Sequence, residues 1–94
     1  MTADTDDLER KALLEFPCQF PIKIMGRDHA EFHEAARTII SRHAGEIAAG
    51  AIRMAASSKG KFISVTITID AVSQQQIDSI YEDLSAHDEI LVAL

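Results

Sequence analysis

The sequence predicts an α+β domain in which two helices cover one face of a four-stranded antiparallel sheet. Two observations support this prediction. Residues 62–70 alternate between apolar and polar side chains, with the period of two that a strand with one buried face requires. Residues 28–44 and 73–86 instead repeat apolar side chains at helical spacing. Strand and helix signals therefore alternate along the chain, as in a two-layer domain.

Length and composition limit the possible architectures. A chain of 94 residues has room for one hydrophobic core, so we expect a single domain. Apolar residues make up 47% and charged residues 26%, which is ordinary for a globular protein. The single cysteine, Cys18, cannot pair within the chain, and we find no leader pattern or long apolar run. These features predict a cytoplasmic protein.

The net charge of −6 is spread unevenly along the chain. Residues 1–15 hold five acids against two bases and residues 73–94 five acids and no base, whereas residues 16–72 hold seven bases against five acids. The acidic residues 1–13 predict a flexible N-terminal arm, which leaves 14–94 as the folded domain. An acidic protein repels phosphate backbones, so nucleic-acid binding is disfavoured. The basic middle segment nevertheless allows a local basic patch, and the polarity suits head-to-tail self-association.

The first strand and the first helix follow directly from local patterns. Residues 19–25 alternate as a strand, in which Pro21 cannot donate a ladder hydrogen bond and should lie near the start or at a bulge. Asp28 is the expected N-cap, because Glu31 completes a capping box three residues later. Gly45 is the expected C-terminal stop. The apolar stripe of this helix is Phe32, Ala35, Ala36, Ile39, Ile40 and His43.

A hairpin is predicted next, after a connection at residues 46–50. Residues 52–56 read as a short edge strand, whose rim is guarded by the charge of Arg53. In the turn at 57–61, Gly60 can adopt the positive φ that a bulged hairpin requires. The central strand then places Ile63, Val65, Ile67 and Ile69 on one face and Phe62, Ser64, Thr66 and Thr68 on the other.

The last two elements are a helix and a strand. Ser73 and Gln76 form a second capping box, and the helix that follows turns Ile77, Ile80, Tyr81 and Leu84 inward. His87 is expected beyond its end. Residues 89–94 predict the last strand, with Ile90, Val92 and Leu94 on one face.

The resulting order of strand, helix, strand, strand, helix, strand is that of the ferredoxin-like βαββαβ sandwich, or alpha-beta plait. In this arrangement the core comprises Phe20, Ile22, Ile24, Ile63, Val65, Ile67, Ile69, Ile90 and Val92 beneath the helices. The opposite sheet face comprises Lys23, Met25, Arg53, Phe62, Ser64, Thr66, Thr68, Leu91 and Ala93. Because half of that face is apolar, we expect a partner or a ligand to contact it.

Several blocks of sequence point to a known family. They are Leu13-Leu14-Glu15-Phe16-Pro17 with Ile24-Met25-Gly26, Arg42-His43-Ala44, Ser57-Ser58-Lys59-Gly60 with Ser64-Val65-Thr66-Ile67-Thr68-Ile69, and Ile80-Tyr81-Glu82-Asp83-Leu84. Together they span about 13–94, and they resemble the YbeD family of small bacterial proteins of uncharacterised function. The resemblance implies a ferredoxin-like fold similar to ACT regulatory domains, with no established activity, no catalytic residues and no cofactor.

The same resemblance suggests where a ligand would bind. ACT domains typically bind small molecules near the turn after the first strand, here Met25-Gly26-Arg27-Asp28, and Gly26 matches the glycine that is usual there. Members of the YbeD family are often encoded beside the octanoyl transferase of lipoate synthesis, which implies a link to lipoate metabolism.

Three smaller patterns have simple structural explanations. His29 and His33 are one helical turn apart, but two histidines fall short of the three or four ligands of a zinc site, so no metal is predicted. The turn at 57–61 has the hydroxyls and cations of an anion nest, although a soluble hairpin is the simpler interpretation. Cys18 lacks a nearby second cysteine and is interpreted as apolar filler.

We interpret the chain as a non-enzymatic regulatory or interaction module that binds a protein partner or senses a small anionic metabolite. Self-association would use the sheet face or an edge strand. The alternative is an RNA-binding module that uses the same face and the basic hairpin, although the third strand presents one aromatic followed by Ser and Thr. A third alternative, an acylphosphatase-like hydrolase, would depend on Arg27. The expected binding residues are Lys23, Arg27, Arg53, Lys59 and Lys61, with Phe62 and Met25 as apolar contacts.

Overall fold

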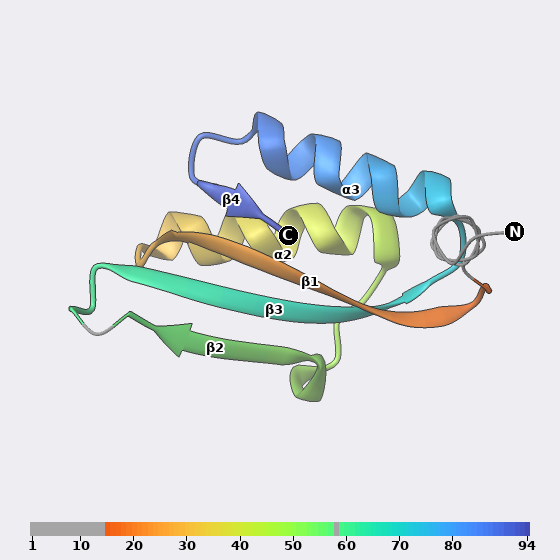
Figure 1. Cartoon of the computed structure of the whole chain (residues 1–94), viewed down its shortest axis with the longest axis horizontal. Coiled ribbons are helices and arrows are strands. Elements are labelled where there is room, and N and C mark those ends of the chain that lie inside the picture. The colour runs from red at the N-terminus through yellow and green to blue at the C-terminus, as the bar shows by residue number, and fades with distance from the viewer. Residues whose placement is uncertain (1–14, 58) are drawn as a thin grey trace, which may run out of the picture.

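The computed structural model describes residues 15–57 and 59–94, so the predicted arm at 1–13 lies outside the described residues. The elements are β1 (Cys18–Arg27), α2 (Ala30–Ala44), the 3-10 turn η1 (Ala49–Ala51), β2 (Ile52–Ala56), β3 (Phe62–Ala71), α3 (Gln74–Ala86) and β4 (Val92–Ala93). Their order confirms the predicted ferredoxin-like fold (Figure 1). Neither described helix is long and apolar enough to cross a bilayer.

The sheet is antiparallel throughout, with the strand order β2-β3-β1-β4. Its centre is the pairing of β1 with β3, which runs without interruption from Cys18 opposite Ala71 to Arg27 opposite Phe62. Both helices lie on one side of the sheet, and α2 passes behind β1 and β4 in the view of Figure 1. None of the described elements covers the other side of the sheet.

The core lies between the helices and the inner face of the sheet, much as predicted. Each large aliphatic side chain that is fully buried there contributes roughly 1.5–3 kcal/mol relative to an exposed one. Phe20 and Cys18 pack against this core while staying half-buried. The residues buried in the core cluster are Ile22, Ile24, Phe32, Ala36, Ile39, Ile40, Ile63, Val65, Ile67, Ile69, Ala71, Ile77, Ile80, Leu84 and Ile90.

Pro21 occupies a regular position in β1, opposite Thr68, rather than a bulge. The Lys23 N–H donates to the Leu94 carbonyl (3.1 Å), and the Leu94 N–H donates back to the Lys23 carbonyl (2.8 Å). Residues two apart in a strand direct their N–H and C=O groups to the same side. The backbone of Pro21 therefore faces the β4 side of β1, as that of Lys23 does, and not β3. The ladder with β3 consequently loses no hydrogen bond to this proline.

The two helix starts differ, and one prediction was wrong. The N-cap of α2 is His29, without a side-chain cap, and not Asp28. The Asp28 N–H donates to the Lys61 carbonyl (3.1 Å), which keeps Asp28 tied to the hairpin one residue before the helix. The N-cap of α3 is Ser73 as predicted, since its hydroxyl accepts the Gln76 N–H (3.1 Å).

The prediction for the last strand was wrong in length and in phase. Strand β4 has two residues, Val92 and Ala93, which lie opposite Met25 and Ile24. Direct partners share a face, so Ala93 points inward while Val92 points outward, and Leu94 shares the outward face with its partner Lys23. The Leu91 N–H also donates to the Met25 carbonyl (2.9 Å), so two consecutive residues lie against Met25 and the alternation is displaced by one.

Gly26 permits this close approach. A Cβ at Gly26 would lie 2.6 Å from the Glu89 carbonyl oxygen and closer still to the Phe32 ring, which is too close for any larger residue. The glycine lies within β1 rather than in the turn that follows. Packing therefore accounts for this residue, which the resemblance to ACT domains had connected with ligand binding.

Candidate functional site

The side of the sheet turned away from the helices, called the outer face below, brings most of the predicted binding residues together. The register places Lys23, Thr66 and Arg53 in one row across β1, β3 and β2. The neighbouring row contains Met25 and Val92. The outer-face residues of the four strands, with Leu94 directly after β4, are Gln19, Pro21, Lys23, Met25, Arg27, Arg53, Ala55, Phe62, Ser64, Thr66, Thr68, Asp70, Val92 and Leu94.

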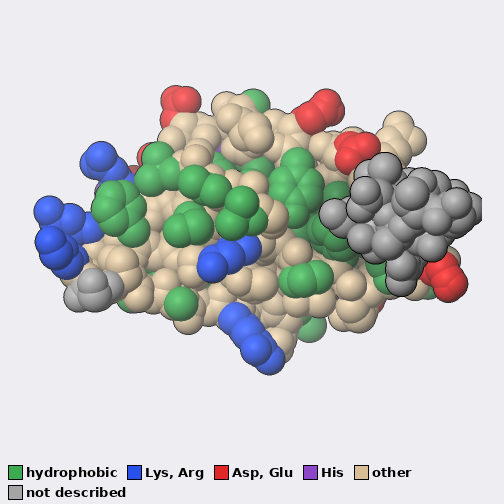
Figure 2. Space-filling view, in the orientation of Figure 1, with side chains coloured by type: hydrophobic (Ala, Val, Ile, Leu, Met, Phe, Trp, Pro, Cys, Tyr) green, Lys and Arg blue, Asp and Glu red, His purple; other side chains and the backbone are tan. Residues whose placement is uncertain are grey.

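Apolar side chains on this face are unusually exposed. Leu94 is 65% exposed, while Val92 and Phe62 are each 42% exposed. With the half-buried Met25 they form a cluster, named the apolar patch here, over β4, the adjoining end of β1 and the first residue of β3, where Figure 2 shows hydrophobic side chains gathered. Sequence reasoning missed Val92 and Leu94 because it placed them on the inner face. Contiguous exposed apolar surface is typical of a contact site.

Cations border the apolar patch on two sides, to its left and below it in Figure 2, whereas carboxylates lie above it on the side of α3. Lys23, Arg27 and Arg53 belong to the outer face, and Lys59 and Lys61 to the turn between β2 and β3. Within residues 15–57 and 59–94, no ion pair includes any of these five cations. The sole carboxylate that the described strands place on this face is Asp70, at the far end of β3, where the Gln19 side chain donates to it. The positive charge of this face is therefore not neutralised by the described residues.

Arg27, Lys61 and Phe62 line a hollow of about 580 Å³ at the end of the outer face, together with Asp28, His29 and Gly60. The two other polar groups of this hollow already have partners. Asp28 Oδ1 lies 2.8 Å from His33 Nε2, and His29 Nδ1 lies 3.3 Å from Glu89 Oε1. Among the described residues that line the hollow, Arg27 and Lys61 are therefore the charged groups without a partner. They could bind an anion that enters the hollow.

The turn at 57–61 is a hydrogen-bonded hairpin. The Ser57 N–H donates to the Phe62 carbonyl (2.8 Å), and the Gly60 N–H donates to the Ser57 carbonyl (3.0 Å). The Phe62 N–H donates to the Ser57 hydroxyl (3.3 Å), and Gly60 has the predicted positive φ, 71°. Because these three N–H groups are satisfied internally, the simple hairpin interpretation fits better than an anion nest. Lys59 and Lys61 are exposed here as charged side chains.

The histidines predicted as neighbours on α2 do not converge on one site. His33 pairs with Asp28 and His29 with Glu89, on different sides of the helix start. In the part of the chain that the structure describes, no group of three or more His, Cys, Asp or Glu side chains could hold a metal ion.

The helix side contains a polar contact that sequence reasoning missed. His43 Nε2 lies 2.6 Å from Asp83 Oδ2, and Arg42 Nη1 lies 3.5 Å from the same oxygen. The hydrogen bond with His43 lowers the pKa of Asp83, and the positive charges of His43 and Arg42 act in the same direction. Gln76 joins the same two helices, since its Nε2 donates to the His43 carbonyl (3.0 Å). These contacts hold α2 against α3.

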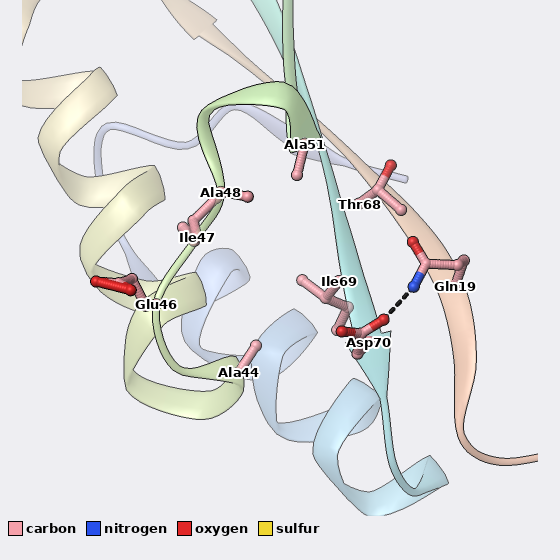
Figure 3. A pocket seen from close by; sticks show the side chains of 9 residues that line it. All are labelled: Gln19, Ala44, Glu46, Ile47, Ala48, Ala51, Thr68, Ile69 and Asp70. Atoms are coloured by element: carbon pink, nitrogen blue, oxygen red, sulfur yellow. Dashed lines mark hydrogen bonds between the residues drawn. The ribbon is translucent and has the colours of Figure 1, made fainter.

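A second, smaller hollow of about 190 Å³ lies between the connection after α2 and the far ends of β1 and β3 (Figure 3). Gln19 and Asp70 are bonded to each other at one side, while Glu46 projects away from the hollow at the other. Its charged residues are both carboxylates, so it repels anions and does not extend the basic face. The lining residues are Gln19, Ala44, Glu46, Ile47, Ala48, Ala51, Thr68, Ile69 and Asp70.

Comparison with known proteins identifies relatives over most of the chain. The family model described as "Protein of unknown function (DUF493)" matches residues 11–94. A UPF0250 protein of Paraburkholderia phytofirmans is 40% identical over 84 residues, which cover 89% of this chain and 94% of the relative. A UPF0250 protein of Chromobacterium violaceum is 40% identical over 86 residues, with 92% and 97% covered. One of Neisseria gonorrhoeae is 37% identical over 90 residues, with 96% and 99% covered.

A solved structure supports the fold. The solution structure of protein HP0495 from H. pylori superposes with a TM-score of 0.65, covering 100% of this chain and 94% of that chain. Its sequence identity is 15%, so this likeness supports the arrangement of strands and helices and says nothing about a shared site.

Proposed function

Since the chain belongs to the DUF493 family of proteins of unknown function, as the YbeD resemblance predicted, we propose a function from the outer face itself. The protein acts as a non-enzymatic interaction module that binds an acidic segment of a partner protein. The observation behind this proposal is the exposed apolar patch, bordered on two sides by cations that have no carboxylate partner among the described residues. The proposal places the protein in the cytoplasm, where Cys18 stays a free thiol.

The two components of the face supply different parts of recognition. Burial of the apolar patch, with Leu94 65% exposed before binding, contributes a gross hydrophobic free energy of about 25 cal/mol per Å² of apolar surface. Only the part that exceeds the entropic cost of association appears as affinity. Cations at the rim increase the rate of encounter and select the sign of the partner's charge. A partner that suits both components carries aspartate or glutamate around a few apolar side chains. A second copy docking face to face would bring like charges together, so the outer face favours a different protein.

Two alternatives from the sequence use the same surface. An RNA-binding sheet would need stacking aromatics, whereas Phe62 is followed on the outer face by Ser64 and Thr66. A small anionic metabolite would contact Arg27 and Lys61 in their hollow and leave the apolar patch exposed. The exposed patch therefore favours a protein partner. The link to lipoate metabolism stays a prediction.

Site-specific photo-crosslinking in cells tests this proposal. A benzophenone amino acid replaces Val92 on the outer face or, as the control position, Glu82 on the exposed side of α3. We expect Val92 to capture a discrete acidic protein that Glu82 does not capture. Lys23→Glu and Lys61→Glu should each reduce that capture at least fivefold. Arg37→Glu makes the same charge change on the exposed side of α2 and should not reduce it.

Three results would contradict the proposal. Equal capture from both positions would show that the outer face is not selective. Capture unaffected by Lys23→Glu and Lys61→Glu would remove the role of the cations. Captured RNA, with a steep loss of binding between 50 and 200 mM salt, would favour the RNA-binding alternative instead.

A further inference from the structure

Strand β2 forms one edge of the sheet, and its hydrogen-bonding pattern leaves that edge open. The Ser57 N–H donates to the Phe62 carbonyl, so Ser57 faces β3. Backbone groups alternate in direction along an antiparallel strand, so Ala55 and Arg53 also face β3, while Ile52, Met54 and Ala56 face outward. The Ile52 N–H is satisfied by the Ala49 carbonyl. The other N–H and C=O groups of these three outward residues have no partner within residues 15–57 and 59–94.

The side chains of the same three residues are apolar and lie on the helix side of β2. They share a face with Ile67, Val65 and Ile63, their partners in β3. The helices, however, pack mainly on β1, β3 and β4. Met54 consequently stays 62% exposed, although it continues the inner face of the sheet. This edge thus combines unpaired backbone groups with uncovered apolar side chains.

The opposite edge of the sheet is protected in ways that β2 is not. Strand β4 has two residues, and the stretch of β1 beyond it presents Pro21, which has no N–H to donate. On β2 the one comparable feature that would discourage pairing with another strand is the charge of Arg53, whose side chain lies on the outer face. A strand can therefore pair with this edge if the residue that it places opposite Arg53 is not a cation.

We propose that β2 pairs antiparallel with β2 of a second copy, in the register that places Met54 opposite Met54 of that copy. Four hydrogen bonds result from the unpaired groups, two between the Met54 residues and two from the Ala56 N–H groups to the Ile52 carbonyls. Arg53 then lies opposite an alanine, Ala55 of the second copy. A register centred on Arg53 would instead oppose the two guanidinium groups, and one centred on Ala55 would shorten the overlap.

The paired sheet has eight strands and one continuous outer face. The two apolar patches lie toward its distant ends, because they extend from β4 over β1 to the first residue of β3 and include no residue of β2. Self-pairing is therefore compatible with partner binding and independent of it. The seam contains five residues per copy, against the roughly 20–30 a side of a stable interface, so association is reversible and depends on concentration.

Charge substitutions at Ala55 test the register. Ala55→Glu places a carboxylate opposite Arg53 of the second copy at two symmetric positions, and Ala55→Lys places a cation there. Each cross-strand ion pair is worth about 0.2–1 kcal/mol, so Ala55→Glu should tighten association about 2- to 30-fold and Ala55→Lys should weaken it. Thr66→Glu adds the same charge to β3, one strand away from the seam, and should tighten association less than Ala55→Glu. Sedimentation velocity at increasing protein concentration and 0.15 M salt measures the dissociation constant.

Met54→Pro provides a second, independent test. It removes the central donor of the seam but no hydrogen bond to β3, so the variant should keep its circular dichroism spectrum and lose association. Monomeric behaviour of both wild type and Ala55→Glu up to 1 mM would overturn the proposal. So would tighter association of Ala55→Lys, or concentration-dependent NMR shifts confined to β4 instead of residues 52–56. These measurements use the protein alone, so their outcome does not depend on the partner of the outer face.

Discussion

On the helix side of the molecule, several charged groups are paired: Asp83 lies 2.6 Å from His43, and His33 lies 2.8 Å from Asp28. On the outer face, Lys23 and Arg53 flank the uncharged Thr66 with no carboxylate partner among the described residues. The two sides also differ in burial, since the inner residues of β3 are buried while Phe62 and Val92 are exposed on the outer face. One side of the sheet is a buried core, and the other presents exposed apolar side chains beside cations without carboxylate partners among the described residues.

The largest expected effect contrasts two neighbours on β3. Ile67 is fully buried on the inner face, and Thr66 lies beside it on the outer face. Ile67→Ala removes buried methylene groups and leaves a cavity, so it should lower the free energy of unfolding by about 2–5 kcal/mol. Thr66→Ala should lower it by less than about 1 kcal/mol. Urea denaturation measures both values, and equal losses would contradict the division of the sheet into a buried and an exposed face.

The alternation of β3 and β1 was enough to predict these two faces from the sequence. Side chains two apart in a strand share a face whatever the fold, so Lys23, Met25 and Phe62 could be assigned to one surface. The helix stripes were equally clear, because Phe32, Ile40 and Leu84 recur with the helical period and are fully buried.

The phase of β4 could not be predicted in the same way. Residues 90–94 are all apolar, so they contain no alternation that would indicate which side is buried. The phase is set instead by the hydrogen bond from Leu91 to Met25 and by the space that Gly26 leaves for Glu89. The contact between His43 and Asp83 was equally hidden, because it joins helices 40 positions apart and no local pattern marks it. Because the phase of β4 could not be predicted, Val92 and Leu94 were assigned to the outer face only from the structure.

A smaller effect, dependent on pH, separates the paired carboxylate from an exposed one on the same helix. The hydrogen bond with His43, aided by the charges of His43 and Arg42, lowers the pKa of Asp83 in the folded protein. A lowered folded pKa stabilises the fold above the unfolded pKa of about 4, and this contribution is lost as the pH falls through the folded value. Wild type should therefore lose stability more steeply than Asp83→Asn on acidification below about pH 5.

Thermal unfolding followed at successive pH values measures this difference. Glu82→Gln, at the exposed neighbouring position, is the matched control and should retain the wild-type slope. Parallel pH profiles for wild type and Asp83→Asn would show that the contact with His43 does not stabilise the helix pair.

The smallest expected effect is a difference in sign. Removing a cation from the outer face should stabilise the protein, whereas removing one from the helix side should destabilise it. Lys23 and Arg53 lie two strand spacings apart, about 10 Å, which is close to the screening length at 0.1 M salt. Lys23→Gln relieves this repulsion and should raise the free energy of unfolding by up to about 0.5 kcal/mol at 20 mM salt, with no change at 0.5 M. Arg42→Gln removes a cation 3.5 Å from Asp83 and should lower stability instead.

Urea midpoints at the two salt concentrations distinguish these signs. If Lys23→Gln were destabilising at both concentrations, Lys23 would serve the fold, and its use for partner binding would lose its physical basis.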